Sequence, residues 1–321
     1  MKVCLGIDVG SVSTNIAVVD EGGQVLDTVY LRTNGQPIEA IQEALAMLEG
    51  RTGILTVAGV GTTGSGRQLA AVVAGADAVK NEITAHAVAA MHIVPEVRTI
   101  LEIGGQDSKI IIIRDGVVTD FAMNTVCAAG TGSFLDQQAA RLNIAIADFG
   151  PRALEATSPV RVAGRCAVFA ESDMIHKQQS GHAIPDILSG LCQALVRNYL
   201  NNVGKGKRIE GPVVFQGGVA ANSGMRQAFE AALGLPLLVP EHYSVMGAIG
   251  AALLAGEQVG RGQETKFRGF GLVHNRYHTA SFECDGCPNI CEVVEIKREE
   301  ELLARWGDRC GRWSNGVGKG K

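Results

Sequence analysis

Two cysteines, Cys127 and Cys166, have the surroundings that most suggest chemistry. Each stands just before a segment with helical character, and they are too far apart in the chain for a compact CxxC clip. The positive end of a helix dipole stabilises a thiolate or an anionic iron–sulfur cluster. Two thiolates cannot complete a 4Fe–4S cluster, which takes four, but two copies of the chain related by a twofold axis can. Seen alone, the pair is also compatible with two buried, inert thiols.

The composition is that of a soluble globular protein with room for two domains. The chain has 321 residues, of which 46% are hydrophobic and 19% charged, and its net charge is −4. This balance gives no reason to expect a nucleic-acid partner. The apolar runs are too short to span a bilayer and the first residues lack a signal-peptide pattern, so we expect a cytoplasmic protein with no membrane partner. Its eight cysteines then point to metal or redox chemistry rather than to disulfides.

A repeated pattern predicts a duplicated α/β domain. Residues 5–20 read as a strand, a turn rich in Gly, Ser and Asp, and a second strand, and residues 101–113 repeat this layout with a shorter turn. Strands alternating with helices imply a mostly parallel or mixed sheet in each half, with a ligand cleft between the halves. We divide the chain into a first subdomain (1–98 plus 244–260), a second subdomain carrying both cysteines (99–243) and a Cys-rich C-terminal extension (261–321).

Both hairpin turns, and one further loop, have the composition of phosphate and nucleotide sites. In the first turn Asp8 is placed to hold Mg²⁺ through water, and the turn itself offers backbone and hydroxyl donors to a phosphate. The second turn pairs two glycines with Gln106 and Asp107, which we predict to orient an attacking water. A third loop with a Gly pair follows a strand and would let adenosine lie flat on the backbone. The predicted contacts are Gly10, Ser11, Val12, Ser13, Gly104, Gly105, Gln106, Gly217, Gly218 and Asn222.

In this order and spacing, the three loops resemble the phosphate-1, phosphate-2 and adenosine motifs of the acetate kinase/sugar kinase/Hsp70/actin superfamily, whose halves are duplicated ribonuclease H-like domains. Over about residues 1–256, with its Cys127-Ala-Ala-Gly-Thr-Gly and Cys166 segments, the chain resembles the BadF/BadG/BcrA/BcrD ATPase family, and within it the activators of 2-hydroxyacyl-CoA dehydratases. We assign Gly130, Thr131 and Gly132 to cofactor binding as well.

The resemblance implies a specific activity. In that family a homodimer shares one 4Fe–4S cluster, and ATP drives a low-potential electron into a partner iron–sulfur enzyme. Carried over by motif, Cys127 and Cys166 are the cluster ligands, and Asp8, Gln106 and Asp107 are the catalytic residues of ATP hydrolysis to ADP. A 2-hydroxyacyl-CoA dehydratase, a benzoyl-CoA reductase or a double-cubane-cluster protein would be the acceptor, and a ferredoxin or flavodoxin the donor.

Two features depart from that family. Asn15 stands where the family usually has a lysine, which removes a cationic contact to phosphate and leaves Lys109 as a nearby substitute. The extension adds Cys284, Cys287, Cys291 and Cys310, enough to close a tetrahedral site. A structural Zn²⁺ site, a second iron–sulfur cluster and four free thiols all remain open for these residues.

Two other functions fit the same nucleotide loops. One is a sugar-type small-molecule kinase, and the other is an Hsp70-like nucleotide switch. Neither explains Cys127 and Cys166, and neither would absorb visible light. Glu82 and His86, one helical turn apart, are expected to be a surface or core pair rather than part of a site.

Overall fold

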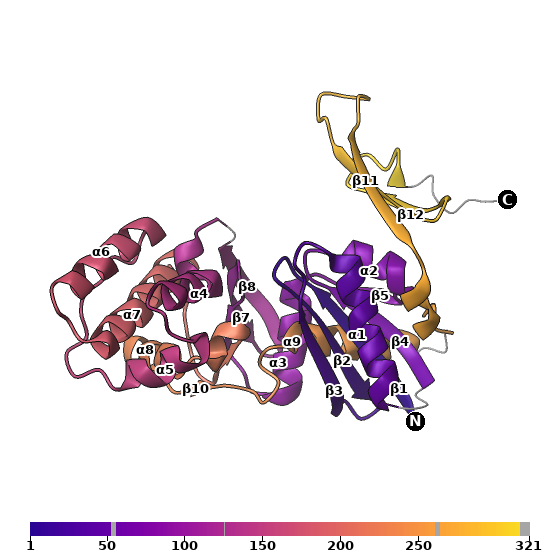
Figure 1. Ribbon diagram of the computed structural model, residues 1–321. Helices are drawn as coiled ribbons and strands as arrows, with labels where there is room; N and C mark the ends of the chain where they lie inside the picture. The colour runs from indigo at the N-terminus through magenta and orange to yellow at the C-terminus, as the bar shows by residue number, and fades with distance from the viewer. Residues whose placement is uncertain (53–55, 125, 261–263, 315–321) are drawn as a thin grey trace. The chain divides into compact units, whose positions relative to one another are not determined.

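The computed structural model describes the whole chain except residues 53–55, 125, 261–263 and 315–321. It divides into two compact units (Figure 1). The first comprises Met1–Glu82 and Gly247–Lys321, and the second comprises Ile83–Met246. The division predicted from the sequence follows the repeated motifs rather than contacts, and it stays a prediction.

The first unit is built on a five-stranded mixed sheet of order β3-β2-β1-β4-β5. Strands β1 (Lys2–Val9), β2 (Ser13–Asp20) and β3 (Val25–Arg32) run antiparallel, while β4 (Thr56–Thr63) and β5 (Ala78–Val79) continue in parallel from β1. Val3, Leu5 and Ile7 alternate along β1 and are fully buried on one face. Helices α1 (Pro37–Thr52) and α2 (Arg67–Ala74) cover that face.

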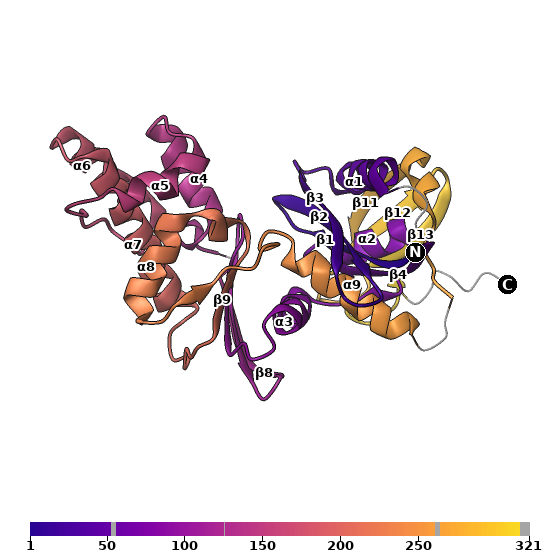
Figure 2. The ribbon, with the colours of Figure 1, turned by 90° about the horizontal axis from the view of Figure 1, so that it is seen from below.

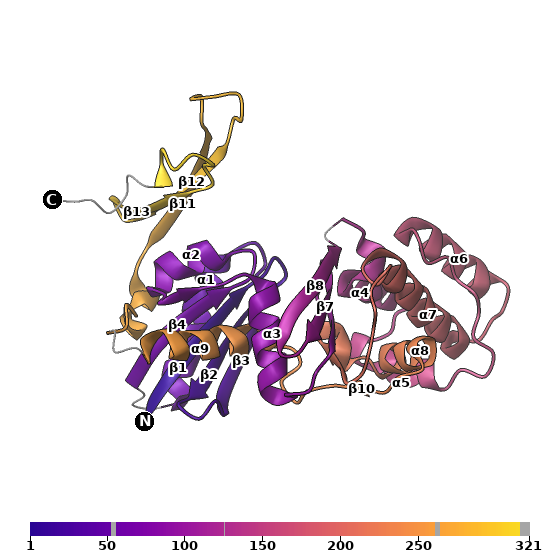
Figure 3. The ribbon, with the colours of Figure 1, turned by 180° about the vertical axis from the view of Figure 1, so that it is seen from behind.

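Helix α9 (Met246–Val259) covers the opposite face of this sheet (Figure 3). It lies so close that a Cβ added to Gly6 would clash with the carbonyl of Ala248, and one added to Gly61 with the carbonyl of Ala251. The glycines that permit this approach are on the strands rather than on the helix.

The second unit repeats the layout with a sheet of order β10-β9-β6-β7-β8. Strands β6 (Thr99–Ile103), β7 (Ser108–Arg114) and β8 (Val117–Asn124) run antiparallel, and β9 (Val213–Gln216) and β10 (Leu237–Leu238) continue in parallel from β6. The two sheets therefore have the same topology, which confirms the duplication that residues 5–20 and 101–113 predict.

The helices of the second unit lie around its sheet, and most of them, though not the first, add residues to one apolar core. In chain order they are α3 (Glu82–Ile93), η1 (Ala128–Gly130), α4 (Gly132–Arg141), α5 (Ile146–Leu154), α6 (Ala167–Gln179), α7 (Ile184–Asn202), η2 (Gly218–Ala221) and α8 (Ser223–Leu233). Helix α7 packs against α5 and α8 (Figure 2). Its Tyr199 meets Phe229 of α8 edge to face, with ring centroids 5.2 Å apart.

The C-terminal extension forms a small sheet of its own. Helix η3 (Phe270–His274) leads into β11 (Tyr277–Glu283), β12 (Glu292–Arg298) and β13 (Glu301–Trp306), which pair antiparallel in this order. The extension is fastened to the first unit, because Nε2 of Gln42 on α1 donates to the carbonyls of Leu272 and Asn275, at 3.0 and 2.9 Å. Within the described part of the chain, no helix has the length and apolarity needed to cross a membrane.

Candidate functional site

The second and third predicted nucleotide loops lie side by side in the second unit. Strands β6 and β9 are parallel neighbours, with Glu102 opposite Gln216, so the loops that follow them leave the same edge of the sheet. Gly217 has a φ of 87°, and a Cβ at this position would collide with the carbonyl of Ile103. Glycine is therefore required where the third loop passes the end of β6.

The segment between Cys127 and helix α4 is hydrogen-bonded to the second turn. The N–H of Gly132 donates to the carbonyl of Gly104 at 2.9 Å, and the N–H of Ser133 donates to that of Gly105 at 2.8 Å. A Cβ on Gly132 would lie 3.0 Å from the Gly104 carbonyl, tighter than most real contacts. Three predicted segments, residues 104–107, 130–132 and 217–218, thus meet in one region of this unit.

An ion-pair network links the second turn to the strands on either side of it. Nζ of Lys109 is 2.9 Å from Oε2 of Glu102 and 2.9 Å from Oδ2 of Asp107, and its side chain is only 2% exposed. The lysine that the sequence suggests as a substitute cation is thus engaged with two carboxylates. Gln106 is exposed and Asp107 half-buried, so both predicted catalytic residues of this turn border solvent.

A buried histidine lies beneath the same region. His86 of α3 places its Nδ1 2.8 Å from Nε2 of Gln216, the last residue of β9. Burial, reinforced by the positive charge of Lys109, lowers the pKa of His86 to about 3. The ring is therefore neutral, and its Nδ1 accepts the amide hydrogen bond. The structure thus places His86 in the core, with Gln216 of β9 rather than Glu82 on its Nδ1.

Asn222 caps a helix. Its Oδ1 accepts from the N–H of Met225 at 3.0 Å, at the first turn of α8. Its Nδ2 is buried with no hydrogen-bond partner among the described residues. An unpaired buried amide costs about 1–3 kcal/mol, so a polar ligand at this loop would relieve that cost.

The first predicted loop belongs to the other unit and is internally bonded. The N–H of Gly10 donates to the carbonyl of Ser13 at 2.9 Å, which forms the turn between β1 and β2. Asp8 and Asn15 stand opposite each other in the strand register. Asn15 is buried and its Nδ2 donates to Oγ of Ser13 at 3.3 Å, whereas Ser11 is exposed at the tip.

The two predicted cluster cysteines occupy equivalent positions in neighbouring segments. Cys127 immediately precedes η1 and Cys166 immediately precedes α6, both in extended conformation. The sulfur of Cys127 is 3.8 Å from the carbonyl oxygen of Arg165 and 3.8 Å from Nδ2 of Asn198. The same Nδ2 donates to the carbonyl of Gly164 at 2.6 Å. Asn198 thus ties the segment of one cysteine to that of the other.

Exposed apolar side chains flank both cysteines. Val126 is 95% exposed, Val168 is 68% exposed and Phe169 is 67% exposed. Large apolar groups left in water beside polar or reactive residues are typical of an interaction surface.

Two asparagines around these cysteines were missed in the sequence analysis. Oδ1 of Asn124 accepts from the N–H of Cys127 at 3.0 Å, while its Nδ2 donates to the Cys127 carbonyl at 2.9 Å. An Asn three residues before a predicted ligand is a local signal that could have been used. Asn198 is distant in sequence, and no local pattern marks it.

In the extension, a backbone hydrogen bond joins the segments of Cys284 and Cys291. The N–H of Cys284 donates to the carbonyl of Cys291 at 2.8 Å, and Nε1 of Trp313 donates to the Cys284 sulfur at 3.3 Å. Donation from Trp313, followed by that from the Gly286 N–H, lowers the pKa of the Cys284 thiol. Cys287 and Cys310 are exposed. Among the described residues no three His, Cys, Asp or Glu side chains are grouped to hold a metal ion, so this site stays a prediction.

A family profile and the most similar curated proteins point to the same family. The profile of the BadF/BadG/BcrA/BcrD ATPase family matches residues 5–255. The chain is 36% identical over 260 residues to the (R)-2-hydroxyglutaryl-CoA dehydratase activating ATPase of Acidaminococcus fermentans, covering 78% of this chain and 96% of that protein. It is 29% identical over 268 residues to a benzoyl-CoA reductase component of Thauera aromatica, covering 79% of this chain and 93% of that protein.

Solved structures agree with this result. The activator of the 2-hydroxyisocaproyl-CoA dehydratase from Clostridium difficile with bound ADPNP superposes with a TM-score of 0.74 at 30% identity, over 81% of this chain and 96% of that chain. The ethanolamine utilization protein EutJ from Carboxydothermus hydrogenoformans, at 16% identity and a TM-score of 0.54, shares the fold. The predicted α/β fold class is confirmed, and the chain belongs to the BadF/BadG/BcrA/BcrD ATPase family.

Proposed function

We propose that this protein is an ATP-dependent activator that passes one low-potential electron to a partner iron–sulfur enzyme. The acceptor is of the class of 2-hydroxyacyl-CoA dehydratases, benzoyl-CoA reductases or double-cubane-cluster proteins, and the donor is a reduced ferredoxin or flavodoxin. The proposal is supported by the names of the relatives and by the arrangement of the second unit.

Mg·ATP is bound by the three glycine-rich loops in this proposal. Asp8 holds Mg²⁺ through water, and the backbone around Gly10, Gly104 and Gly105 contacts phosphates. Gln106 and Asp107 orient the water that attacks the terminal phosphate, giving ADP and phosphate. The adenosine rests on Gly217 and Gly218, where the unpaired Nδ2 of Asn222 offers it a donor.

Cys127 and Cys166 would hold a 4Fe–4S cluster together with the same two residues of a second copy of the chain. The residues present fit such a group: both are at the start of a helical segment, both are half-buried rather than sealed in the core, and Asn198 keeps their segments together. A cluster bound there supplies a one-electron carrier. Val168 and Phe169 would then be buried in the homodimer.

Two hydrogen bonds support a mechanical coupling between the bound nucleotide and the cysteines. The carbonyls of Gly104 and Gly105 in the phosphate turn accept hydrogen bonds from Gly132 and Ser133, only a few residues after Cys127. A change in the turn on hydrolysis therefore displaces the start of α4 and the Cys127 segment together.

The cluster assignment is tested by iron and sulfide analysis of protein purified without oxygen. We expect about four irons per dimer and a visible absorbance, both lost in Cys127→Ala and Cys166→Ala but kept in Cys4→Ala. Phe169→Glu should give a monomer without iron, whereas Phe121→Glu, an exposed aromatic on β8, should not. A colourless dimer that hydrolyses ATP would instead favour a kinase or a nucleotide switch.

A further inference from the structure

A cationic cavity adjoins the Cys166 segment in the second unit, apart from the predicted nucleotide loops. Its volume is about 650 Å³, within the range of small-molecule sites. Its walls are the loop that precedes α6, one face of α6 and the C-terminal part of α7. The lining includes Arg161, Arg165, Asp173, His176, Lys177 and Arg197.

The cavity carries more positive charge than its surroundings balance. Four cationic side chains line it, against the single carboxylate of Asp173, whose Oδ2 accepts the N–H of Ala163 at 2.8 Å. In the part of the chain that the structure describes, none of the four cations forms an ion pair. Partial burial, together with the positive charge of the neighbouring Arg161, lowers the pKa of Arg197.

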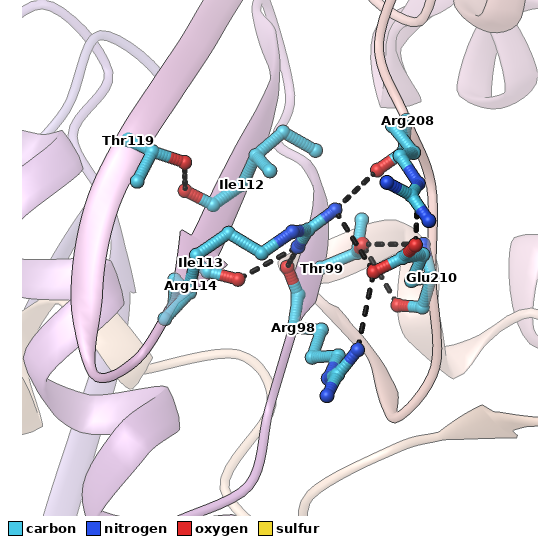
Figure 4. A network of polar contacts seen from close by, with 8 residues as sticks. All are labelled: Arg98, Thr99, Ile112, Ile113, Arg114, Thr119, Arg208 and Glu210. Carbon is cyan, nitrogen blue, oxygen red and sulfur yellow. Dashed lines mark hydrogen bonds and ion pairs between the residues drawn. The ribbon is translucent and has the colours of Figure 1, made fainter.

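Other arginines of the same unit are treated differently. Arg98, Arg114 and Arg208 all converge on the carboxylate of Glu210 (Figure 4). Each of these three guanidinium groups has a carboxylate partner within the protein, although they share one. The cations of the cavity differ in that none of them has such a partner among the described residues, which leaves them available to an anionic ligand.

The wall of the cavity is held in place by both helices. Nη2 of Arg197 donates to the carbonyl of Val162 at 2.7 Å, and Nδ2 of Asn198 donates to that of Gly164 at 2.6 Å. Gly164 packs against α7 so closely that an added Cβ would lie 2.8 Å from the Ala194 carbonyl. A site fixed in this way loses little freedom on binding.

We propose that this cavity binds a small phosphate-bearing anion. Guanidinium groups match the oxygens of a phosphate in a planar, forked geometry, and Lys177 adds a point charge. The chain's net charge of −4 does not favour a nucleic acid, and the volume of about 650 Å³ suits a small ligand. Because Gly164 and Arg165 lead directly to Cys166, the ligand would hold the segment that carries this cysteine; that consequence rests on the proposed function, while the binding itself does not.

The test is calorimetric titration of the full-length protein, kept in saturating Mg·ADP so that the nucleotide loops are filled. Inorganic phosphate and pyrophosphate are the two probes. We expect saturable binding, one per chain, weakened by about tenfold or more in the double variant Arg161→Gln/Lys177→Gln. Tighter binding of pyrophosphate would identify a diphosphate group as the ligand's anion, and equal binding a single phosphoryl group.

The control is Arg208→Gln, which removes an exposed arginine outside the cavity and should leave the affinity unchanged. The thermal midpoint of each variant shows that it is folded. Equal affinities in the wild type and the double variant would overturn the proposal, as would no binding of either probe. Binding of a hexaglutamate peptide alone would also overturn it, and would assign the cavity to carboxylates of a partner protein.

Discussion

At the residue scale, the turn after β6 places an exposed amide and a half-buried carboxylate beside the buried ammonium of Lys109, at the start of β7. Lys109 holds Oδ2 of Asp107, so the carboxylate has a fixed orientation before any ligand arrives. The sequence pattern pointed to Gln106 and Asp107 through their position in a glycine turn. It could not place Lys109 between Asp107 and Glu102, because that depends on the pairing of β6 with β7.

Asp107→Asn should therefore lower ATP turnover by about 100-fold, since it removes the charge that orients the attacking water while keeping the shape. The Kd for ATP should change by less than about threefold. Lys109 keeps its contact with Glu102, so the fold is retained. Asp120→Asn, which removes a surface partner of Lys207, is the matched control for turnover. Unchanged turnover in Asp107→Asn would remove this residue from catalysis.

His86 makes stability depend on pH. Its pKa is about 3 in the folded protein and about 6.5 when unfolded, so the unfolded state binds more protons between these values. Stability is therefore fully present above about pH 6.5 and falls by up to about 1.4 kcal/mol per pH unit as the pH is lowered. Denaturant midpoints between pH 7 and 5 should show a smaller slope in His86→Gln. His92→Gln, on the exposed side of the same helix, should keep the wild-type slope; equal slopes in all three proteins would contradict this account.

At the element scale, sequence patterns predicted the strands that bury one or both faces. Residues 5–20 and 101–113 correspond to β1–β2 and β6–β7. Their strands could be predicted because burial requires the apolar residues that form the sequence pattern. Strand β8 was not predicted, because polar residues interrupt its apolar pattern and most of its residues, Val117 and Phe121 among them, are exposed. Strands β5 and β10 have only two residues each, too few for any periodicity.

Asn198 of helix α7 contacts the segments of both cysteines, and no local sequence pattern reveals this contact. Asn198→Ala removes the donor to the Gly164 carbonyl and should cost about 1–3 kcal/mol of unfolding free energy, measured by chemical denaturation. Bound iron should also be lost more readily, because the two cysteine segments are no longer tied. Asn202→Ala, one turn along and bonded to Oδ1 of Asn198, should cost less than about 1 kcal/mol. A larger effect for Asn202 than for Asn198 would refute the assignment.

The extension offers a separate test of its four cysteines. If they bind Zn²⁺ or a second cluster, metal analysis of the full chain should show a metal that is lost in Cys284→Ser and Cys287→Ser but kept in Cys4→Ser. Donation from Trp313 to the Cys284 sulfur favours the thiolate that a metal requires. Metal content unaffected by both substitutions would leave these residues as free thiols.

At the scale of the whole molecule, duplication explains why a single chain carries the predicted loops on two similar sheets. The strand orders β3-β2-β1-β4-β5 and β8-β7-β6-β9-β10 are equivalent, and the repeat in the sequence predicted this. The attachment of the extension to α1 through Gln42 could not be predicted, because it joins residues far apart in the chain by side-chain-to-backbone bonds.

The central claim is that the nucleotide state is transmitted from the Gly104–Gly105 turn to the Cys127 segment. The most direct measurement is the rate at which an iron chelator removes iron from the anaerobic dimer, in Mg·ADP and in Mg·ADPNP. The account predicts rates that differ several-fold, because the bonds from Gly132 and Ser133 carry the change to the cysteine. Equal rates at saturating concentrations of both nucleotides would contradict it.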